Sequence, residues 1–352
     1  MSDLLSTTIS KIEGKMKVII DNKIPYIKEA VERIADEVVY LPGNGFTREA
    51  VKDADALIIR TRTCCNRALL EGSRVKFIAT ATIGYDHIDV EYCREAGIVW
   101  TNCPGCNAGS VEQYVHSVLL LLKREKGLDL QNATIGVVGV GHVGSRVARM
   151  AGQLGMKVLL NDPPRADKGE QGFVDLKTIA RECDVVTFHT PLNRVGSYRT
   201  FHLADNNFFL SLERTPYIIN SSRGEVVDTA SLLSALADGR VKDAVIDTWE
   251  NEPCISYELL EKAYLATPHI AGYSADGKAN ATRMSLEALC RFFGLEDEFT
   301  ISPPELSGLQ LSDNPEEAFL QLYDPTRDSK WLKASPEKFE WFRGNYPIRR
   351  EI

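Results

Sequence analysis

The stretch Thr134-Ile-Gly-Val-Val-Gly-Val-Gly-His-Val-Gly144 decides the fold of this 352-residue chain. It contains a short apolar strand, the pattern G-x-G-x-x-G at Gly139, Gly141 and Gly144, and the beginning of a helical run. A strand, a glycine turn and a helix in this order are typical of a dinucleotide-binding α/β fold. In such a fold Gly139 permits the tight turn, Gly141 lets the backbone approach a pyrophosphate, and Gly144 lets the helix pack close to the strand.

The residues around this loop favour NAD as the dinucleotide. We expect the pyrophosphate to lie at the helix N-terminus, at His142 and Val143. The next predicted strand ends in Asn161-Asp162, about twenty residues past the loop. An acidic residue there accepts hydrogen bonds from the ribose diol and repels a 2′-phosphate, so Asp162 predicts NAD. Arg165 keeps NADP open as an alternative, because a nearby arginine can bind that phosphate.

Short β-branched runs alternate with helical segments on both sides of the loop. This alternation predicts βαβ units and parallel sheets. Apolar residues at helical spacing over 110–126 predict a long helix between two series of strands. The expected strands are 17–21, 37–41, 56–60, 77–80 and 98–101 before that helix, and 134–139, 157–161, 185–188, 217–220, 244–247 and 264–267 after it.

The composition excludes several classes of protein. The chain is 44% hydrophobic and 26% charged, which is typical of a globular protein of two or three domains. Its net charge of −8 argues against a nucleic-acid partner. No apolar run approaches the length of a membrane span, and residues 1–15 lack the apolar core of a secretory signal. We therefore expect a cytoplasmic protein with an N-terminal extension over 1–15 and no membrane partner.

The tight cysteine pair Cys103-Pro-Gly-Cys106 is a candidate redox or metal motif. No second C-x-x-C and no nearby histidine cluster completes a zinc site. A Pro-Gly turn flanked by two thiols is the favoured interpretation, and no metal is expected.

Three polar groups follow later strands and form a complete set for hydride transfer at a hydroxy acid. His269 is a base that works near neutral pH, and Arg223 offers a planar bidentate partner for a substrate carboxylate. A carboxylate bonded to the far ring nitrogen fixes the histidine tautomer, and Glu252 is the predicted one. Glu250 and Asp247 are alternatives for that role.

Three motifs behind the glycine loop, R-G-x-x-V-D at 223–228, D-x-W-E-x-E-P at 247–253 and P-H-I-A-G-Y at 268–273, resemble those of D-isomer-specific 2-hydroxyacid dehydrogenases. The resemblance implies the catalytic triad Arg223, Glu252 and His269. It also implies an α/β architecture in which a Rossmann-type, doubly wound NAD domain is inserted into a flavodoxin-like substrate domain. The expected ranges are 113–269 for the NAD domain, 16–112 plus 270–294 for the substrate domain, and 295–352 for a small dimerisation module of a homodimer.

The strings D-P-P-R-A-D at 162–167 and T-A-T-I-G-Y-D-H at 80–87 are most similar to members of this family that oxidise a phosphorylated sugar acid in vitamin B6 biosynthesis. Other D-2-hydroxy acids, such as 3-phosphoglycerate, and a non-catalytic NAD-sensing regulator are the alternatives. Substrate contacts are implied at Thr61, Thr82 and Tyr273. Cofactor contacts are implied at Asp162, Thr190, Ser221, Ser222, Arg223, Asp247 and Gly272. Arg60 is the first candidate for the substrate phosphate, with Arg62, Arg349 and Arg350 as others.

Overall fold

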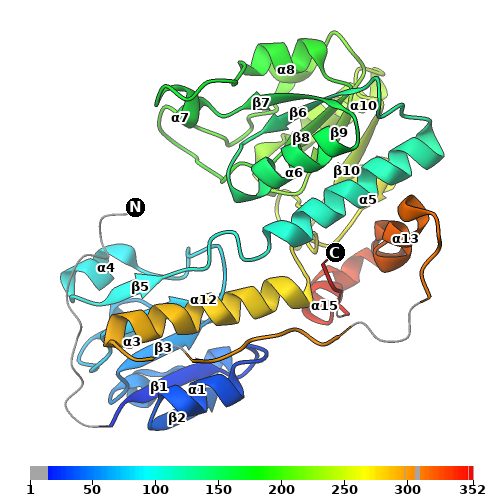
Figure 1. Ribbon diagram of the computed structural model, residues 1–352. Coiled ribbons are helices and arrows are strands. Elements are labelled where there is room, and N and C mark those ends of the chain that lie inside the picture. The colour runs from blue at the N-terminus through cyan, green and yellow to red at the C-terminus, as the bar shows by residue number, and fades with distance from the viewer. Residues whose placement is uncertain (1–14, 297, 306–309, 348, 352) are drawn as a thin grey trace. The chain divides into compact units, whose positions relative to one another are not determined.

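The computed structural model describes residues 15–296, 298–305, 310–347 and 349–351. The chain divides into two compact units (Figure 1), of which the first comprises Met1–Asn107 with Ser274–Leu306 and the second Ala108–Tyr273 with Ser307–Ile352. The predicted N-terminal extension lies outside the described residues except for Lys15. The chain crosses from one unit to the other after Asn107 and returns after Tyr273.

The first unit contains a five-stranded parallel sheet in the order β2-β1-β3-β4-β5, which is the flavodoxin-like order. Its strands are β1 (Lys17–Asp21), β2 (Glu37–Leu41), β3 (Ala56–Ile59), β4 (Phe77–Thr80) and β5 (Val99–Thr101). Its helices are α1 (Lys28–Ile34), α2 (Arg48–Val51), α3 (Arg67–Leu70), α4 (Val90–Glu95) and α12 (Ala275–Phe293), with a 3-10 turn at Gly43–Gly45.

Both faces of this sheet are buried, because successive β1 residues point to opposite sides. Val18 and Ile20 pack with Leu286 of α12 on one face, while Ile19 belongs to the core on the other. Helix α12 returns from the second unit and lies along this sheet (Figure 1). The unit is therefore assembled from two distant parts of the sequence.

The second unit contains a six-stranded parallel sheet in the order β11-β10-β9-β8-β6-β7. Its strands are β6 (Thr134–Val138), β7 (Lys157–Asn161), β8 (Val185–Phe188), β9 (Tyr217–Asn220), β10 (Asp243–Ile246) and β11 (Leu265–Ala266). Beyond β7, Phe173 makes one isolated parallel bridge to Leu160. Because the chain turns from β6 outward in both directions, the sheet has a switch point at the end of β6, where ligands bind in such folds.

Helices cover both faces of the six-stranded sheet. They are α5 (Ala108–Lys126), α6 (His142–Gln153), α7 (Pro163–Ala166), α8 (Leu176–Glu182), α9 (Asn206–Leu210), α10 (Thr229–Ala237) and α11 (Tyr257–Lys262), with a 3-10 turn at Gly224–Val226. Ile135 and Val137 of β6 pack with residues of α5 and α6, whereas Val138 packs with residues of α8 and α10. The predicted doubly wound α/β architecture is confirmed.

The C-terminal segment packs onto the second unit of its own chain. It contains α13 (Pro315–Leu322), α14 (Pro325–Ala334), a 3-10 turn at Pro336–Lys338, and α15 (Phe339–Gly344). Helix α13 packs against α5 (Figure 1), and α14 packs beside β11, where the Ser329 hydroxyl accepts a hydrogen bond from Ala266 N–H at 3.0 Å. The segment therefore continues the core of this unit.

Arg349 and Arg350 contact the beginning of α5. The buried Arg349 donates to the Ala271 carbonyl at 2.7 Å and to the Ser110 hydroxyl. Its guanidinium also stacks 3.8 Å from the Tyr323 ring centroid. Ser110 and Ala271 lie next to two of the points at which the chain passes between the units, after Asn107 and after Tyr273, so Arg349 joins the segments that carry these two crossings.

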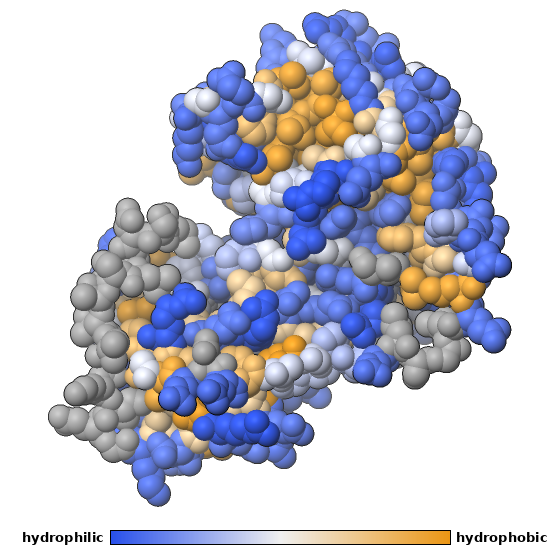
Figure 2. Space-filling view, viewed as in Figure 1, coloured by the Kyte–Doolittle hydropathy of each residue, from blue (hydrophilic) through white to orange (hydrophobic). Residues whose placement is uncertain are grey.

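Hydrophilic residues cover most of the face shown in Figure 2. Among the described residues, none of the helices combines the length and the apolar character needed to cross a membrane.

Candidate active site

The carboxyl ends of the six parallel strands of the second unit meet at one edge of the sheet. Each of these ends is followed by a segment that the sequence analysis marked as functional. These segments begin at Gly139, Asp162, Thr190, Ser221, Asp247 and Thr267. The fold therefore brings the predicted nucleotide-binding and catalytic residues to a common edge.

The glycine loop requires glycine for steric reasons at two positions. Gly139 has φ +86°, and a Cβ on it would lie 2.8 Å from the His189 carbonyl carbon. A Cβ on Gly144 would lie 1.9 Å from the Gly139 oxygen, which fixes the close approach of α6 to the loop. A Cβ on Gly141, the N-cap of α6, would instead have no neighbouring atom of the described residues within 4 Å. His142 and Val143 form the first turn of α6, as the predicted pyrophosphate site requires.

Asp162 connects the glycine loop to the end of β7. Its Oδ2 accepts from Val140 N–H at 2.8 Å, and its Oδ1 caps α7 by accepting from Arg165 N–H at 3.2 Å. The Arg165 side chain is bound to Glu170, with Nε 2.9 Å from Oε2, and donates to the Val140 carbonyl. Arg165, the alternative 2′-phosphate ligand, is thus already engaged within the chain.

Three hydroxyls near this edge are buried and lack a hydrogen-bond partner among the described residues. They are Thr190 Oγ1, Ser221 Oγ and Thr248 Oγ1, which follow β8, β9 and β10. A buried polar group without a partner is costly, so such atoms favour a ligand that supplies the missing bonds. Together with the open space at Gly141, they fit a bound dinucleotide.

His269 contacts Glu252. The His269 Nδ1–H donates to Glu252 Oε2 at 2.8 Å, and Glu252 Oε1 accepts from Trp249 N–H at 2.9 Å. His269 has φ +55°, a left-handed backbone conformation uncommon outside glycine, and its backbone N–H donates to the Asp247 carbonyl. Because Nδ1 is engaged with the carboxylate, Nε2 is the nitrogen that can exchange a proton with a ligand.

The ionisation of Glu252 is set by opposing influences. Burial favours its neutral form, but the hydrogen bond and charge of His269, the Trp249 N–H and the nearby Arg343 outweigh burial and lower the pKa of Glu252. A carboxylate that stays ionised can hold the imidazole in one tautomer and stabilise the imidazolium.

The other two candidate acids have different contacts. Glu250 binds His202 Nε2 at 2.6 Å and accepts from Thr229 N–H at 2.9 Å. Asp247 is fully buried, which raises the pKa of its carboxyl, and it accepts from the Thr267 hydroxyl and from the backbone of 270–271. Of the three acids, only Glu252 contacts the His269 ring in the described part of the chain.

One group of potential metal ligands exists among the described residues, formed by His202, Asp228 and Glu250 within 4.8 Å. Asp228 caps α10 by accepting from Ser231 N–H, and Glu250 bonds His202. These hydrogen bonds account for the grouping.

The loop that carries Arg223 is shaped by two neighbours. Asn220 donates to the Arg223 carbonyl at 2.9 Å and accepts from Ser222 N–H at 3.2 Å. A Cβ on Gly224 would lie 1.9 Å from the Trp249 carbonyl carbon, so the Arg223 loop packs directly on the loop that leads to Glu252. The Arg223 guanidinium donates to the Ser222 carbonyl at 2.8 Å.

Gly272 and Tyr273 lie three and four residues after His269. The Tyr273 ring lies 6.1 Å from the Tyr346 ring in an edge-on arrangement. Arg343 of α15 interacts with Tyr273, and its Nη1 is 3.8 Å from Glu252 Oε2. The sequence analysis missed Arg343, because no motif or spacing connects α15 to the histidine loop.

The substrate residues implied in the first unit follow β3 and β4. Thr61 is exposed, and Arg60 Nε lies 3.3 Å from Oδ2 of the fully buried Asp21. The Thr82 hydroxyl bonds Thr80 at 2.7 Å and the Gly84 carbonyl at 2.9 Å. Both strands end at the same edge of the five-stranded sheet. Arg60 places a cation at this edge. Burial lowers the pKa of Lys278 of α12, and the nearby positive charge of Arg60 lowers it further.

Cys103 is buried against α12 and contacts the Ser285 hydroxyl at 3.4 Å. Burial raises the pKa of Cys103 to about 11, which makes its thiol inert at neutral pH.

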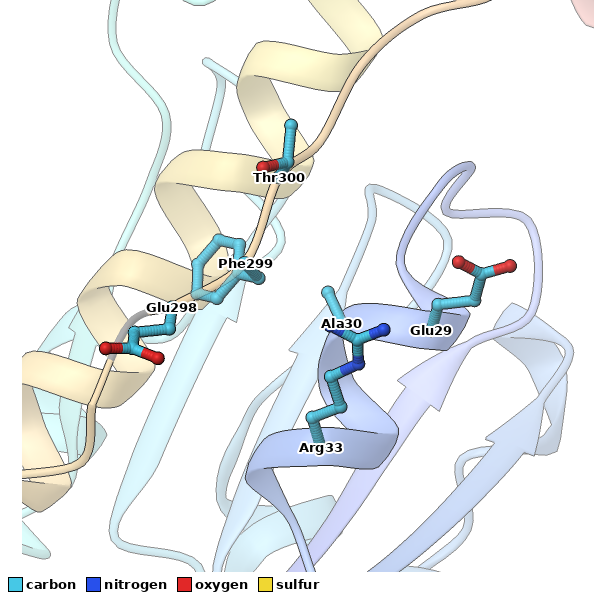
Figure 3. Close-up of a pocket in the computed structure, with 6 residues that line it drawn as sticks. All are labelled: Glu29, Ala30, Arg33, Glu298, Phe299 and Thr300. Carbon is cyan, nitrogen blue, oxygen red and sulfur yellow. The ribbon is translucent and has the colours of Figure 1, made fainter.

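A cavity of about 550 Å³ in the first unit lies away from all these residues. It lies between α1, which supplies Glu29, Ala30 and Arg33, and the segment after α12, which supplies Glu298, Phe299 and Thr300 (Figure 3). None of the predicted site residues lines it.

Comparison with known proteins relates this geometry to a family. Residues 111–271 match the NAD binding domain of D-isomer specific 2-hydroxyacid dehydrogenases. The chain is 62% identical over 338 residues to the erythronate-4-phosphate dehydrogenase of Bacteroides fragilis, covering 96% of this chain and 97% of that protein. It is 43% identical over 347 residues to the enzyme of the same name from Porphyromonas gingivalis, covering 96% and 94%.

Solved structures give the same relationship. The D-lactate dehydrogenase of Aquifex aeolicus, complexed with NAD and lactic acid, is 25% identical with a TM-score of 0.64, covering 79% of this chain and 95% of that chain. The NAD+-bound 3-phosphoglycerate dehydrogenase of Entamoeba histolytica is 25% identical with a TM-score of 0.65, covering 82% and 99%.

Proposed function

The chain belongs to the D-isomer-specific 2-hydroxyacid dehydrogenase family, among the erythronate-4-phosphate dehydrogenases, and we propose that it oxidises 4-phospho-D-erythronate at C2. The product is (R)-3-hydroxy-2-oxo-4-phosphooxybutanoate, an intermediate of pyridoxal 5′-phosphate biosynthesis. The chain is an NAD-binding dehydrogenase. The observation that carries the chemistry is the 2.8 Å contact between His269 Nδ1 and Glu252 Oε2. The choice of substrate is supported by the relatives at 62% identity over nearly the full length.

His269 is the proposed base. Its Nε2 takes the proton of the C2 hydroxyl while the C2–H bond breaks with both electrons leaving as a hydride, so that the C2–O bond becomes a carbonyl. Glu252 stabilises the imidazolium that forms and keeps Nε2 directed at the substrate. When bound, NAD supplies the acceptor of the hydride.

Arg223 is the proposed partner of the substrate carboxylate. A guanidinium binds a carboxylate through two parallel hydrogen bonds and can polarise the C2 oxygen at the same time. Thr61, Thr82 and Tyr273 are the proposed contacts to the rest of the substrate, because a hydroxyl can both donate to and accept from a sugar-acid hydroxyl or phosphate. Arg60 is the proposed cation for the phosphate.

The proposed nucleotide contacts follow the strand ends of the second unit. Residues 139–144 would hold the pyrophosphate and Asp162 the ribose diol. The buried hydroxyls of Thr190 and Ser221 support further contacts, and Ser222, Asp247 and Gly272 are proposed from the family pattern. Asp247 would act mainly by shaping the histidine loop, since its oxygens accept from Thr267, Ile270 and Ala271.

We further propose a cytoplasmic homodimer that uses the segment 295–352. Scattered cysteines suit a reducing compartment. The exposed Trp341 on α15 supports an interface on this segment, since aromatic side chains are enriched in interfaces. Light scattering of the full chain and of a Trp341→Glu variant would show a dimer converted to a monomer if Trp341 lies in that interface.

Absorbance of the reduced nicotinamide tests the reaction. The enzyme is mixed with NAD and 4-phospho-D-erythronate, 3-phosphoglycerate or D-lactate, and a 2-oxo acid is added so that tightly held NADH can be reoxidised. Turnover dominated by 4-phospho-D-erythronate is expected. Turnover with another acid alone would keep the catalytic residues and contradict the substrate, whereas NAD binding without any turnover would favour an NAD-sensing regulator.

A further inference from the structure

Arg343 of the C-terminal segment faces the carboxylate that the catalytic histidine uses. Its Nη1 lies 3.8 Å from Glu252 Oε2, and the same oxygen accepts from His269 Nδ1 at 2.8 Å. A single carboxylate oxygen is therefore shared between a guanidinium and an imidazole. The guanidinium comes from a side chain of α15 and not from a loop at the sheet edge.

The surroundings of Arg343 make this contact effective. The side chains of Arg343 and Glu252 are 28% and 17% exposed, so the charges are only partly screened by water. Arg343 Nε is buried and has no hydrogen-bond partner among the described residues, whereas Nη1 also contacts Glu340 at 3.1 Å. Burial opposes the charged form, but interactions with Tyr273, Glu252 and Glu340 raise the pKa of Arg343 and keep it cationic.

We propose that Arg343 is a positioning residue that holds Glu252 in place for His269 and balances the charge of the Glu252–His269 pair during proton transfer. This inference rests on the proposed function, because it concerns the base of that reaction. Arg343 also connects the pair to Tyr273, a proposed substrate contact. The C-terminal segment would then contribute to catalysis as well as to packing.

The charges around the pair determine the direction of the effect. Glu252 and the buried Asp247 face His269, while Arg343 faces Glu252 and is itself paired with Glu340. Without the guanidinium, the negative charge of Glu252 would act on His269 alone and favour the imidazolium. Since the neutral imidazole is the base in oxidation, the acidic limb of the pH profile should move to higher pH.

Three variants test the proposal. Arg343→Gln removes the charge, Arg343→Lys keeps a charge without the planar fork, and Arg327→Gln changes an exposed arginine of α14 that stacks on Trp331. For each, kcat/KM for 4-phospho-D-erythronate is measured across pH. We expect the kcat/KM of Arg343→Gln to be roughly tenfold lower than that of the wild type at pH values below the acidic limb, and to differ much less above it. A shift of the limb by about one pH unit corresponds to this factor of ten. Arg343→Lys should restore most of the profile, and Arg327→Gln should match the wild type.

A second readout does not depend on turnover. The ring resonances of His269 are titrated by NMR in the wild type and in Arg343→Gln, and the titration curve of the variant is expected at higher pH. An unmoved curve, or an equal loss of kcat/KM at every pH, would overturn the proposal and leave Arg343 with a packing role. If the wild type oxidises none of the acids, the proposed function fails, but the titration still decides the role of Arg343.

Discussion

The guanidinium of Arg165 donates to the Val140 carbonyl at 2.7 Å, while Asp162 accepts from the N–H of the same residue at 2.8 Å. Asp162, the proposed ribose ligand, and Arg165, the alternative ligand of a 2′-phosphate, therefore both bind the backbone of Val140. Glu170 binds the rest of the Arg165 fork. Cofactor choice is thus expected to depend on three side chains.

We predict that Asp162→Ser lowers the preference for NAD over NADP, by roughly tenfold for each 1.4 kcal/mol of lost repulsion. The double variant Asp162→Ser with Glu170→Gln should lower it further, because Arg165 is then released towards a 2′-phosphate. The ratio of kcat/KM for the two cofactors measures the effect. Glu170→Gln alone is the control, and a full switch in that single variant would refute the role of Asp162.

Removal of the base should separate chemistry from binding. His269→Ala is expected to reduce turnover by about 10²–10⁴-fold, because general acid–base catalysis contributes that much. NAD affinity, followed by quenching of tryptophan fluorescence, should stay near that of the wild type. The turnover of Glu252→Gln should lie between that of the wild type and that of His269→Ala, since His269 loses its ionised partner. Normal turnover in His269→Ala would exclude it as the base.

The proposed phosphate contact predicts a difference between substrates. Arg60→Ala should raise KM for 4-phospho-D-erythronate by roughly 10–100-fold, the equivalent of one charge-assisted hydrogen bond or a little more, and should affect D-lactate far less. Because Arg60 also neighbours the buried Asp21, the melting temperature is recorded for the variant. Arg94→Ala, which changes an exposed arginine of α4 in the same unit, is the matched control. Equal losses on both substrates would eliminate the phosphate role of Arg60.

The C-terminal cluster predicts a pH-dependent stability. Burial raises the pKa of Asp328, while contacts with Tyr346, Arg349 and Tyr323 act in the opposite direction. A carboxyl whose pKa is higher in the folded state favours folding below its ordinary range near pH 3.8, and this contribution is lost as the pH rises through the folded value. Asp328→Asn should therefore gain stability relative to the wild type as the pH rises from 4 upward in urea unfolding.

Arg349 provides the companion test. Arg349→Met removes the cation from Asp328 and the hydrogen bonds to Ser110 and Ala271, so it should lose roughly 3 kcal/mol at neutral pH and less at pH 4. A loss of the same size at both pH values would mean that the hydrogen bonds, not the charge on Asp328, dominate the effect.

Local patterns were sufficient to predict most of the sheet architecture. The strands 17–21, 37–41, 157–161, 185–188 and 217–220 agree with the structure at both ends, because each is a β-branched or apolar run between turn residues. The last strand is shorter than expected and covers only Leu265–Ala266. The backbone N–H of Tyr264 donates to the Asp243 side chain instead of to a strand, whereas the Thr267 N–H still donates to the Ile246 carbonyl just beyond the assigned end of the strand.

The proximity of His269 and Glu252 could be predicted, because both follow buried strands and parallel strands bring such positions to one edge of the sheet. The catalytic roles of His269, Glu252 and Arg223 stay predictions. The contacts of Arg343 and Arg349 could not be predicted in this way. Their contacts depend on how α13, α14 and α15 fold back over the second unit, and tertiary packing of this kind leaves no periodic signal in the sequence.

The contact between Ser329 and Ala266 limits how two copies of the protein can associate. β11 is the edge of the six-stranded sheet, and an uncovered edge is a template for another strand. The Ala266 N–H that would receive such a strand is already bonded by Ser329, and α14 lies beside it. Two subunits therefore cannot merge their sheets through β11 into one continuous sheet. The same cover protects the folded chain against edge-to-edge aggregation.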